Sequence, residues 1–282
     1  MLTLEMSQVK NKITEIVNEL LIGGGAVLVK RAFSADEVKV ARDAILHYST
    51  NESDKATHFH GANEDKIHLQ RRVWNLLNKG QVFERMVQKS EVVAVLNEFL
   101  GNEFILGSIA ANRLMPGAAG QEPHVDYPYL DIFKPGSFPN NMNSSFALNA
   151  QVTILLDEFT TDNGATAYTP GSQRELSWPL NADEFYKGAS RQLGEAGDCV
   201  IFNGMVWHCA MPNNSNADRI GVLIQYLAKF VTPFEDQKNG VSPEVLSRAT
   251  PVLKRLLGGN YPFPHMMDEL PAENAYGLTS EN

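Results

Sequence analysis

"GDCVIFNGMVWHCAMPNNSNADRIGVLIQYL" (residues 197–227) contains the pattern that decides the fold. Two apolar, β-branched runs, 198–203 and 219–229, are separated by a shorter run at 206–210 and by Gly, Pro, Asn and Asp residues. Short runs of this kind, bounded by turn-forming residues, are typical of β-strands. We therefore expect three consecutive strands here and a domain that is mainly β.

The same texture begins at residue 104 and continues to about 230. Further strands are expected at 104–114, 121–127, 147–156, 165–169 and 189–193. About eight short strands with turn residues between them are typical of a sandwich or barrel, and this number fits a double-sheet jelly roll. The predicted fold is therefore a cupin-like jelly-roll core, or double-stranded β-helix, with flanking helices.

The chain outside this core reads as mostly helical, and we interpret all of 1–282 as a single domain. Residues 1–103 form a helical buttress, 104–230 the catalytic core, and 231–282 a C-terminal helix and tail. Ser34 and Glu37 make a capping-box signature for one of the helices. The expected helices are 8–21, 35–48, 80–88, 91–99 and 242–258, with a short strand in 23–29 and a kink or division at Pro251.

The polar segment 49–69 is expected to be a loop. It contains His58, His60 and His68, and the first two have a spacing that metal ligands use. No regular element places a further ligand with them, so we interpret all three as solvated histidines.

Composition excludes several classes of function. The net charge is −9, from 24 basic and 33 acidic residues, and no concentrated Lys/Arg run could follow a phosphate backbone, so nucleic acid is not expected as a partner. The sequence contains neither a signal-peptide pattern nor about 18 consecutive apolar residues, which predicts a cytoplasmic protein without a membrane partner. Cys199 and Cys209 are then expected to be buried thiols.

A second stretch, "QEPHVDYPYL" (121–130), carries candidate metal ligands. Residues i and i+2 of a strand share one face, so His124 and Asp126 are expected to lean into the same space. His208, late in the 206–210 strand, supplies a third group. Two histidines and one carboxylate form the facial triad of non-haem Fe(II) oxygenases, which leaves positions open for a co-substrate and O2.

Arg219 is a candidate anion-binding residue. Alternation along the 219–229 strand puts Arg219, Gly221, Leu223 and Gln225 on one face, and apolar residues on the other. A buried arginine requires an anion, and the guanidinium fork matches a dicarboxylate. The alternative is an ion pair at the rim with Asp218.

With these residues the chain resembles the phytanoyl-CoA dioxygenase family of Fe(II)/2-oxoglutarate-dependent oxygenases. The resemblance rests on "HVDYPY", on "VTILLDEFTTDNGATAYTPGSQ" (152–173), on "GDCVIFNGMVWHCAMPNNSNADR" (197–219) and more loosely on "GGGAVLVKRAFSADEVKVAR" near the N-terminus. Two positions depart from the family pattern. Gln173 replaces the usual histidine, and Ala210 stands where the family often has a hydroxyl residue that helps the arginine.

The resemblance implies that His124, Asp126 and His208 hold Fe(II), and that Arg219 grips the distal carboxylate of 2-oxoglutarate. Thr153 aligns with a family position near the co-substrate, and Gln151 shares its face of the 147–156 strand. The implied reaction consumes O2 and 2-oxoglutarate, releases succinate and CO2, and oxidises an unactivated C–H bond. Halogenating relatives lack the carboxylate, so Asp126 favours hydroxylation, or a related desaturation or cyclisation.

The segment 127–146 follows directly and is too long for a hairpin turn. Loops of this length in compact domains are usually functional, so we interpret it as a substrate lid. Its aromatic residues, among them Tyr127, Tyr129 and Phe133, would line an apolar wall for a small molecule such as a secondary metabolite. Arg72 and Asn112 are expected at the surface, and 163–164 and 170–171 are expected to be turns without a chemical role.

Two other classes of function remain open at this stage. One is a metal-dependent cupin-type isomerase or epimerase that does not use 2-oxoglutarate. The other is a catalytically silent jelly-roll binding protein, since fold alone does not define function. The substrate and the oligomeric state are not readable from the sequence.

Overall fold

A large sheet and a small sheet form the β core of the computed structural model, which describes residues 1–51, 64–126, 147–175, 177–179 and 181–259. Seven strands in the order β1-β2-β8-β5-β10-β4-β3 make the large sheet, and β7-β6-β9 make the small one. The strands are β1 Leu2–Glu5, β2 Ala26–Lys30, β3 Gln70–Val73, β4 Ile105–Leu114, β5 Asn149–Leu155, β6 Ala167–Tyr168, β7 Ser190–Arg191, β8 Cys199–Asn203, β9 His208–Cys209 and β10 Arg219–Leu227. This is the jelly-roll core that the sequence predicts.

The large sheet is antiparallel except for the parallel pair β1–β2. Its strands alternate as predicted, because residues i and i+2 share a face. Val152 and Ile154 of β5 and Ile220, Val222 and Ile224 of β10 pack into the largest apolar core with the helices. The opposite face of the same strands is therefore left to build a cavity.

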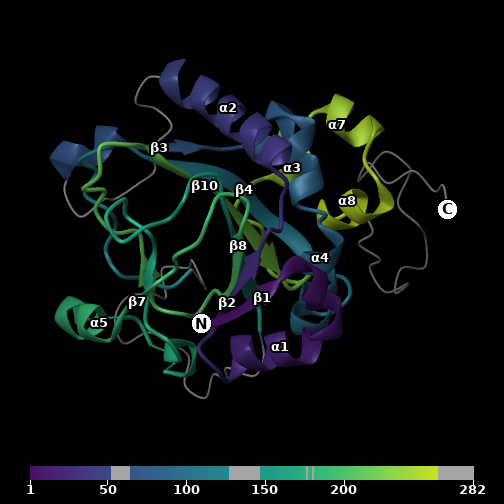
Figure 1. The fold of residues 1–282 in the computed structure, drawn as a ribbon. Coiled ribbons are helices and arrows are strands. Elements are labelled where there is room, and N and C mark those ends of the chain that lie inside the picture. The colour runs from purple at the N-terminus through teal and green to yellow at the C-terminus, as the bar shows by residue number, and fades with distance from the viewer. Residues whose placement is uncertain (52–63, 127–146, 176, 180, 260–282) are drawn as a thin grey trace.

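Helices cover the outer face of the large sheet. The helices are α1 Ile13–Leu21, α2 Ala35–Asn51, α3 Gln81–Met86, α4 Ser90–Leu100, α5 Ala182–Gly188, α6 Gln237–Gly240, α7 Pro243–Ser247 and α8 Pro251–Leu256. Figure 1 shows α2, α3, α4, α7 and α8 gathered on one side of the molecule, with α5 on the other. Apolar side chains of α1, α2, α3, α4, α7 and α8 complete the core that holds the outer face of the sheet.

The predicted capping box begins α2 as expected. The Ser34 amide donates to Glu37 Oε2 at 2.9 Å, and the Glu37 amide donates back to Ser34 Oγ at 3.3 Å. The predicted 242–258 helix is divided, because α7 ends at Ser247 and α8 begins at Pro251, a residue that starts helices but cannot continue them. Strands β1 and β3 were not predicted from the sequence.

The small sheet packs on the inner face of the large one. Tyr168 of β6 lies in a second apolar cluster with Leu28 of β2, Leu155 of β5 and Phe202 of β8. Its strands are only two residues long. The segment 121–126 runs beside β9 and pairs with it through a single bridge, His124 to His208, so the predicted strand 121–127 is wrong as a regular strand.

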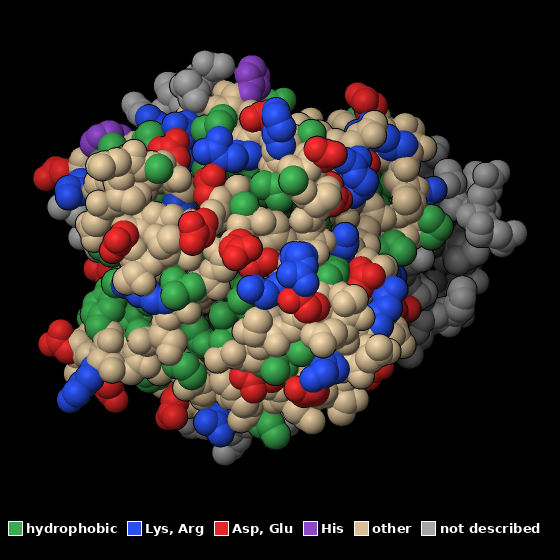
Figure 2. Space-filling view, in the orientation of Figure 1, with side chains coloured by type: hydrophobic (Ala, Val, Ile, Leu, Met, Phe, Trp, Pro, Cys, Tyr) green, Lys and Arg blue, Asp and Glu red, His purple; other side chains and the backbone are tan. Residues whose placement is uncertain are grey.

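Other predictions concern the surface and the ends of the chain. On the face in Figure 2, basic and acidic side chains are interspersed. Among the described residues, no helix is long and apolar enough to cross a membrane. Cys199 and Cys209 are both buried and free, as predicted. His58, His60, the lid segment 127–146 and most of the C-terminal tail lie outside the described residues.

Candidate active site

The structure brings His124, Asp126 and His208 together, although 84 positions of sequence separate the two histidines. The backbones of His124 and His208 exchange two hydrogen bonds of 2.9 Å. The Asp126 amide donates to the Gly204 carbonyl at 2.9 Å, and Asn149 Nδ2 of β5 donates to the Asp126 carbonyl at 3.1 Å. These backbone contacts aim all three side chains at one point.

The three side chains have the geometry of a metal centre. His124 Nε2 lies 3.7 Å from Asp126 Oδ1, and His208 Nε2 lies 3.2 Å from Asp126 Oδ2. One ligand atom from each residue lies within 4.8 Å of the others. This is the only such group of three among the described residues, and His68, which is exposed, is not part of it.

The hydrogen bonds of the two histidines suit metal binding. His124 Nδ1 lies 2.7 Å from the Glu122 carbonyl, and His208 Nδ1 lies 2.8 Å from the Val206 carbonyl. A carbonyl only accepts, so each Nδ1 must carry hydrogen. In the neutral ring Nε2 then has the free lone pair, which is the tautomer that metal-binding histidines use. Two imidazole nitrogens and a carboxylate fit a divalent iron.

Burial and mutual charge perturb the triad. Burial and repulsion from His208 lower the pKa of His124 to about 4. Burial opposes ionisation of Asp126, but attraction to His208, a hydrogen bond from it and attraction to His124 together lower the pKa of Asp126 to about 2. Burial also acts against the charged form of His208, and the charge and hydrogen bond of Asp126 outweigh it, so the pKa of His208 is raised. The carboxylate is therefore ionised at neutral pH and ready to bind a cation.

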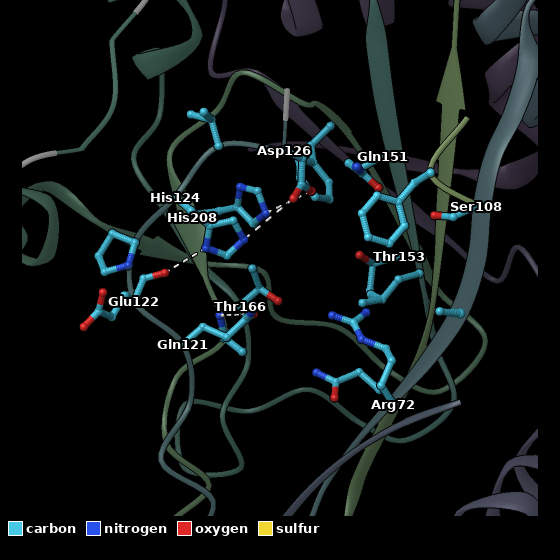
Figure 3. Close-up of a pocket in the computed structure, with 18 of the residues that line it drawn as sticks. Arg72, Ser108, Gln121, Glu122, His124, Asp126, Gln151, Thr153, Thr166 and His208 are labelled. Atoms are coloured by element: carbon cyan, nitrogen blue, oxygen red, sulfur yellow. Dashed lines mark hydrogen bonds and ion pairs between the residues drawn. The ribbon is translucent and has the colours of Figure 1, made fainter. Parts of the chain in front are cut away.

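A cavity of about 530 Å³ opens beside the triad, a size typical of small-molecule sites. Figure 3 shows the two histidines on one side, Arg72 on the other, and Gln151 and Thr153 on the wall next to them. That wall belongs to the large sheet, where Thr153 of β5 pairs with Leu223 of β10, and Leu223 pairs with Ala110 of β4. The cavity therefore lies between the two sheets.

Arg219 lies in the cavity wall at the start of β10 and is 1% exposed. Its Nη2 donates to the Gly164 carbonyl at 2.6 Å, and its guanidinium lies 4.4 Å from the centre of the Phe159 ring. Burial lowers the pKa of Arg219 to about 9, and repulsion from Arg72 adds to this shift, whereas Asp157 opposes it.

No described carboxylate forms an ion pair with Arg219. Asp218, the alternative partner, binds Arg113 at 2.6 Å. Asp157 instead accepts hydrogen bonds from Arg42 Nε at 2.7 Å and from the Ile220 amide at 2.9 Å. The cation that faces the cavity is thus suited to bind an anion that enters it.

Two glycines lie next to the groups that contact this arginine. A Cβ on Gly221 would lie 3.0 Å from Phe159 Cζ, the ring on which Arg219 rests. Gly164 has φ +84°, and a Cβ there would meet the Met211 carbonyl oxygen at 2.5 Å. The sequence-based view of 163–164 as a turn without a chemical role was incomplete, because the Gly164 carbonyl binds Arg219.

The structure also places the other predicted residues. Thr153 and Gln151 line the cavity, whereas Tyr127, Tyr129 and Phe133 lie outside the described residues. The expectation of surface positions for Arg72 and Asn112 was wrong. Arg72 and Asn112 pair between β3 and β4, and both line the cavity. Strand β3 was missed because the run "QRRVW" (70–74) contains a single aliphatic residue, yet its alternation puts Gln70, Arg72 and Trp74 on one face.

The two departures from the family pattern have different consequences. Gln173 is fully buried and donates to the Gly23 carbonyl at 3.0 Å, so it joins the chain before β2 to the turn after β6 and does not line the cavity. Ala210 does line the cavity. Thr166 and Gln121 also line it, and they were missed by sequence reasoning; Gln121 Oε1 accepts from the Ala210 amide at 3.4 Å.

The fold and the site together define a jelly-roll protein with a two-histidine, one-carboxylate centre, the arrangement of non-haem iron oxygenases. Comparison with known families agrees with this class. The profile of the phytanoyl-CoA dioxygenase (PhyH) family matches residues 23–221, and the chain belongs to this family.

Similar proteins include dioxygenase af480 of Aspergillus fumigatus, which is 26% identical over 196 residues, 66% of this chain and 58% of that protein. The alignment thus covers less than two thirds of af480. Dioxygenase ALT11 of Alternaria alternata is 25% identical over 258 residues, 85% of this chain and 80% of that protein. The structure also resembles the epimerase SnoN, crystallised with Fe3+, alpha ketoglutarate and nogalamycin RO, with a TM-score of 0.59 and 15% identity over 78% of this chain and 85% of SnoN.

Proposed function

We propose that the protein is a non-haem Fe(II)/2-oxoglutarate-dependent dioxygenase that hydroxylates an unactivated C–H bond of a small molecule and releases succinate and CO2. One observation carries the proposal. The buried cation of Arg219 and the cluster of His124, Asp126 and His208 face the same 530 Å³ cavity. A dicarboxylate with a metal-binding end matches both groups. When bound, iron and 2-oxoglutarate would supply the oxidising chemistry.

The chain's own residues would then hold and orient these groups. His124, Asp126 and His208 would hold the metal through Nε2 and carboxylate atoms, and the Nδ1 bonds to the Glu122 and Val206 carbonyls would fix the ring orientation. Arg219 would bind the distal carboxylate, held in position by the Gly164 carbonyl and by the Phe159 ring. Thr153 and Gln151 are candidate hydrogen-bond donors to the co-substrate from β5.

The relatives support the co-substrate and leave the reaction outcome to be tested. The similar SnoN structure contains iron and alpha ketoglutarate, yet that enzyme is an epimerase. The use of 2-oxoglutarate on this fold is therefore compatible with outcomes other than hydroxylation. Incorporation of one oxygen atom from labelled O2 into the product would support hydroxylation, and its absence in a substrate that is consumed would contradict it.

The metal and co-substrate are tested by an anaerobic titration of the Fe(II)-loaded protein with 2-oxoglutarate. Chelation of 2-oxoglutarate to Fe(II) gives a weak visible charge-transfer band. We expect the band in the wild type, and we expect Arg219→Ala to need at least about tenfold more 2-oxoglutarate, because hydrogen bonds to charged groups contribute roughly 1.5–3 kcal/mol.

Arg71→Ala is the matched control, since it removes the same charge from β3 but does not line the cavity. It should titrate like the wild type. A wild-type protein that binds iron but gives no band would contradict the proposed co-substrate. It would favour the isomerase or epimerase class that does without 2-oxoglutarate.

A further inference from the structure

A second cationic group, Arg72, lies on the side of the cavity opposite the two histidines (Figure 3). It comes from β3, which lies at one edge of the large sheet and pairs with β4. Because side chains alternate along β3, Val73 packs into the apolar core with the helices, whereas Arg72 and Trp74 line the cavity on the other face. Arg72 therefore belongs to the inside of the site, and Arg71 to the other face of the strand.

Arg72 lies against an aromatic platform at the cavity wall, which is formed by Trp74 and Phe234. Its guanidinium lies 5.5 Å from the centre of the Trp74 ring, within the range of a cation–π contact. The Trp74 ring in turn stacks on Phe234, with centroids 5.4 Å apart and an angle of 29° between the planes. Phe234 is 55% exposed, so the platform reaches from the cavity to the solvent. A cation thus adjoins two near-parallel aromatic rings.

Partly buried hydrogen bonds of Glu235 hold this platform in place. Its Oε1 accepts from the Asn75 amide at 2.7 Å, and its Oε2 accepts from the Ile109 amide of β4 at 2.6 Å. The Glu235 amide donates to the Gly107 carbonyl at 3.0 Å. Glu235 directly follows Phe234, and Asn75 directly follows Trp74. The hydrogen bonds of Glu235 therefore join these two segments to each other and to β4 of the large sheet. Such anchoring is what a preorganised binding surface requires.

Charge distinguishes this platform from the co-substrate site. Arg219 and the metal centre would account for the two ends of 2-oxoglutarate, so Arg72 is a third positive centre in the same cavity. Among the described residues, those with a carboxylate that line the cavity are Asp126, a proposed metal ligand, and Glu122, which is exposed. One guanidinium group can pair with one anionic group. Its single positive charge is not enough to bind the several phosphates of an acyl-CoA.

We propose that Arg72, Trp74 and Phe234 form the substrate subsite, and that the substrate is a small acid that carries one carboxylate on a planar, apolar body. The carboxylate binds Arg72, and the planar body stacks on Trp74 and Phe234. This inference rests on the proposed function for its assignment of Arg219 to 2-oxoglutarate, but it predicts binding that can be measured without turnover.

The test uses 2-naphthoate as the probe and neutral 2-naphthamide as its matched partner. Calorimetry measures the binding of each probe to the protein, anaerobically with Fe(II), both without and with 2-oxoglutarate. We expect the wild type to bind naphthoate more tightly than naphthamide. Arg72→Met should weaken naphthoate by about tenfold or more and leave naphthamide unchanged, because it removes a charged hydrogen-bond donor. Phe234→Ala should weaken both probes.

Two further variants act as controls. Arg71→Met makes the same change of charge one residue away on the opposite face of β3 and should bind both probes like the wild type. Arg72→Lys retains the charge and should recover part of the naphthoate affinity, although it lacks the planar fork. Thermal melts of all variants identify any that fail to fold, in which case Arg72→Lys and Phe234→Ala carry the test.

The outcomes separate this inference from the proposed function. Equal naphthoate affinity in the wild type and Arg72→Met overturns the subsite, as does a wild type that binds neither probe. If Arg72→Met instead raises the 2-oxoglutarate requirement and leaves naphthoate unchanged, Arg72 belongs to the co-substrate and the subsite is again overturned. A wild type that binds naphthoate through Arg72 but gives no charge-transfer band with 2-oxoglutarate would contradict the proposed function alone.

Discussion

The large sheet and the small sheet contribute to the cavity in different ways. The large sheet has long strands, up to ten residues in β4 and nine in β10, and it contributes Arg219, Thr153 and Gln151. The small sheet has strands of two residues, yet it carries His208 and pairs with His124. The large sheet also holds the main apolar core against the helices. No residue of β6 or β9 belongs to that core, and Ala167 and Cys209 pack instead against Phe185 of α5.

This difference suggests that stability and metal chemistry are separated within one fold. The metal-facing side chains are positioned by a few backbone hydrogen bonds, such as those between His124 and His208. The anion-binding wall is positioned by the packing of the opposite face of the same strands. Substitutions in the two sheets should therefore have effects of different kinds.

The largest effect is expected at the small sheet. His208→Ala removes one of the three proposed metal ligands and should abolish stoichiometric Fe(II) binding, since even loss of residues that only support a ligand costs about 10–100-fold in metal affinity. The exposed His68→Ala is the control and should bind iron normally. Iron content after desalting measures this. If metal-free His208→Ala lost more stability than the large-sheet variant below, the separation of roles would be wrong.

A core substitution in the large sheet should have the opposite profile. Ile224 of β10 is 1% exposed and packs in the apolar core between the large sheet and the helices. Ile224→Ala should lower the free energy of unfolding by about 2–5 kcal/mol, through lost burial and the cavity that remains, and the folded fraction should still bind iron. Urea denaturation measures the change, with the exposed Ile22→Ala as control. Loss of iron from a variant that remains folded would contradict the comparison.

Gly221→Ala tests the cavity face of the same strand and should have an intermediate effect. The new methyl group would lie 3.0 Å from Phe159 Cζ and displace the ring on which Arg219 rests. We expect about a tenfold higher 2-oxoglutarate requirement in the anaerobic titration, because the charged hydrogen bond would be misplaced. Iron binding should be unchanged. A normal 2-oxoglutarate titration would show that Phe159 yields without moving the arginine.

The smallest effect is expected from Glu235 at the edge of the large sheet. Burial raises the pKa of Glu235, although hydrogen bonds from Ile109 and Asn75 oppose the shift. A carboxyl group with a raised pKa contributes stability below its unfolded pKa and loses that contribution as the pH rises through its folded pKa. The stability of the wild type relative to Glu235→Gln should therefore fall as the pH rises from 4 to 7. Urea denaturation across this range measures it, and a difference that grows with pH would contradict the assignment.

The same division explains how much of the fold could be predicted. Strands of the large sheet such as β5 and β10 carry a long period-2 pattern, because one face packs on helices and the other lines a cavity. The short strands β6 and β9 contain too few residues to show a period, and the sequence therefore predicted both strands to be longer than they are. Strand β3 has the residues of a polar loop, and only its pairing with β4 makes it a strand.

The candidate site was predicted unevenly for a related reason. His124, Asp126, His208 and Arg219 stand out because charged or metal-binding groups are unusual beside apolar strands. Arg72 stands out less, since the two residues before it, Gln70 and Arg71, are also polar. Its entry into the cavity depends on contacts between residues far apart in the chain. These include the Glu235 bonds to Asn75 and Ile109, which a local pattern does not contain.

The position of His208 in one sheet and of Arg219 in the other has a mechanical consequence. Residues 209–218 join them along the chain, and elsewhere the apolar cluster that contains Tyr168, Leu28, Leu155 and Phe202 packs the two sheets together. A dicarboxylate bound at both ends would act as a removable cross-link between them. Amide hydrogen exchange should then slow in both sheets on loading, and the melting temperature should rise with the logarithm of co-substrate concentration.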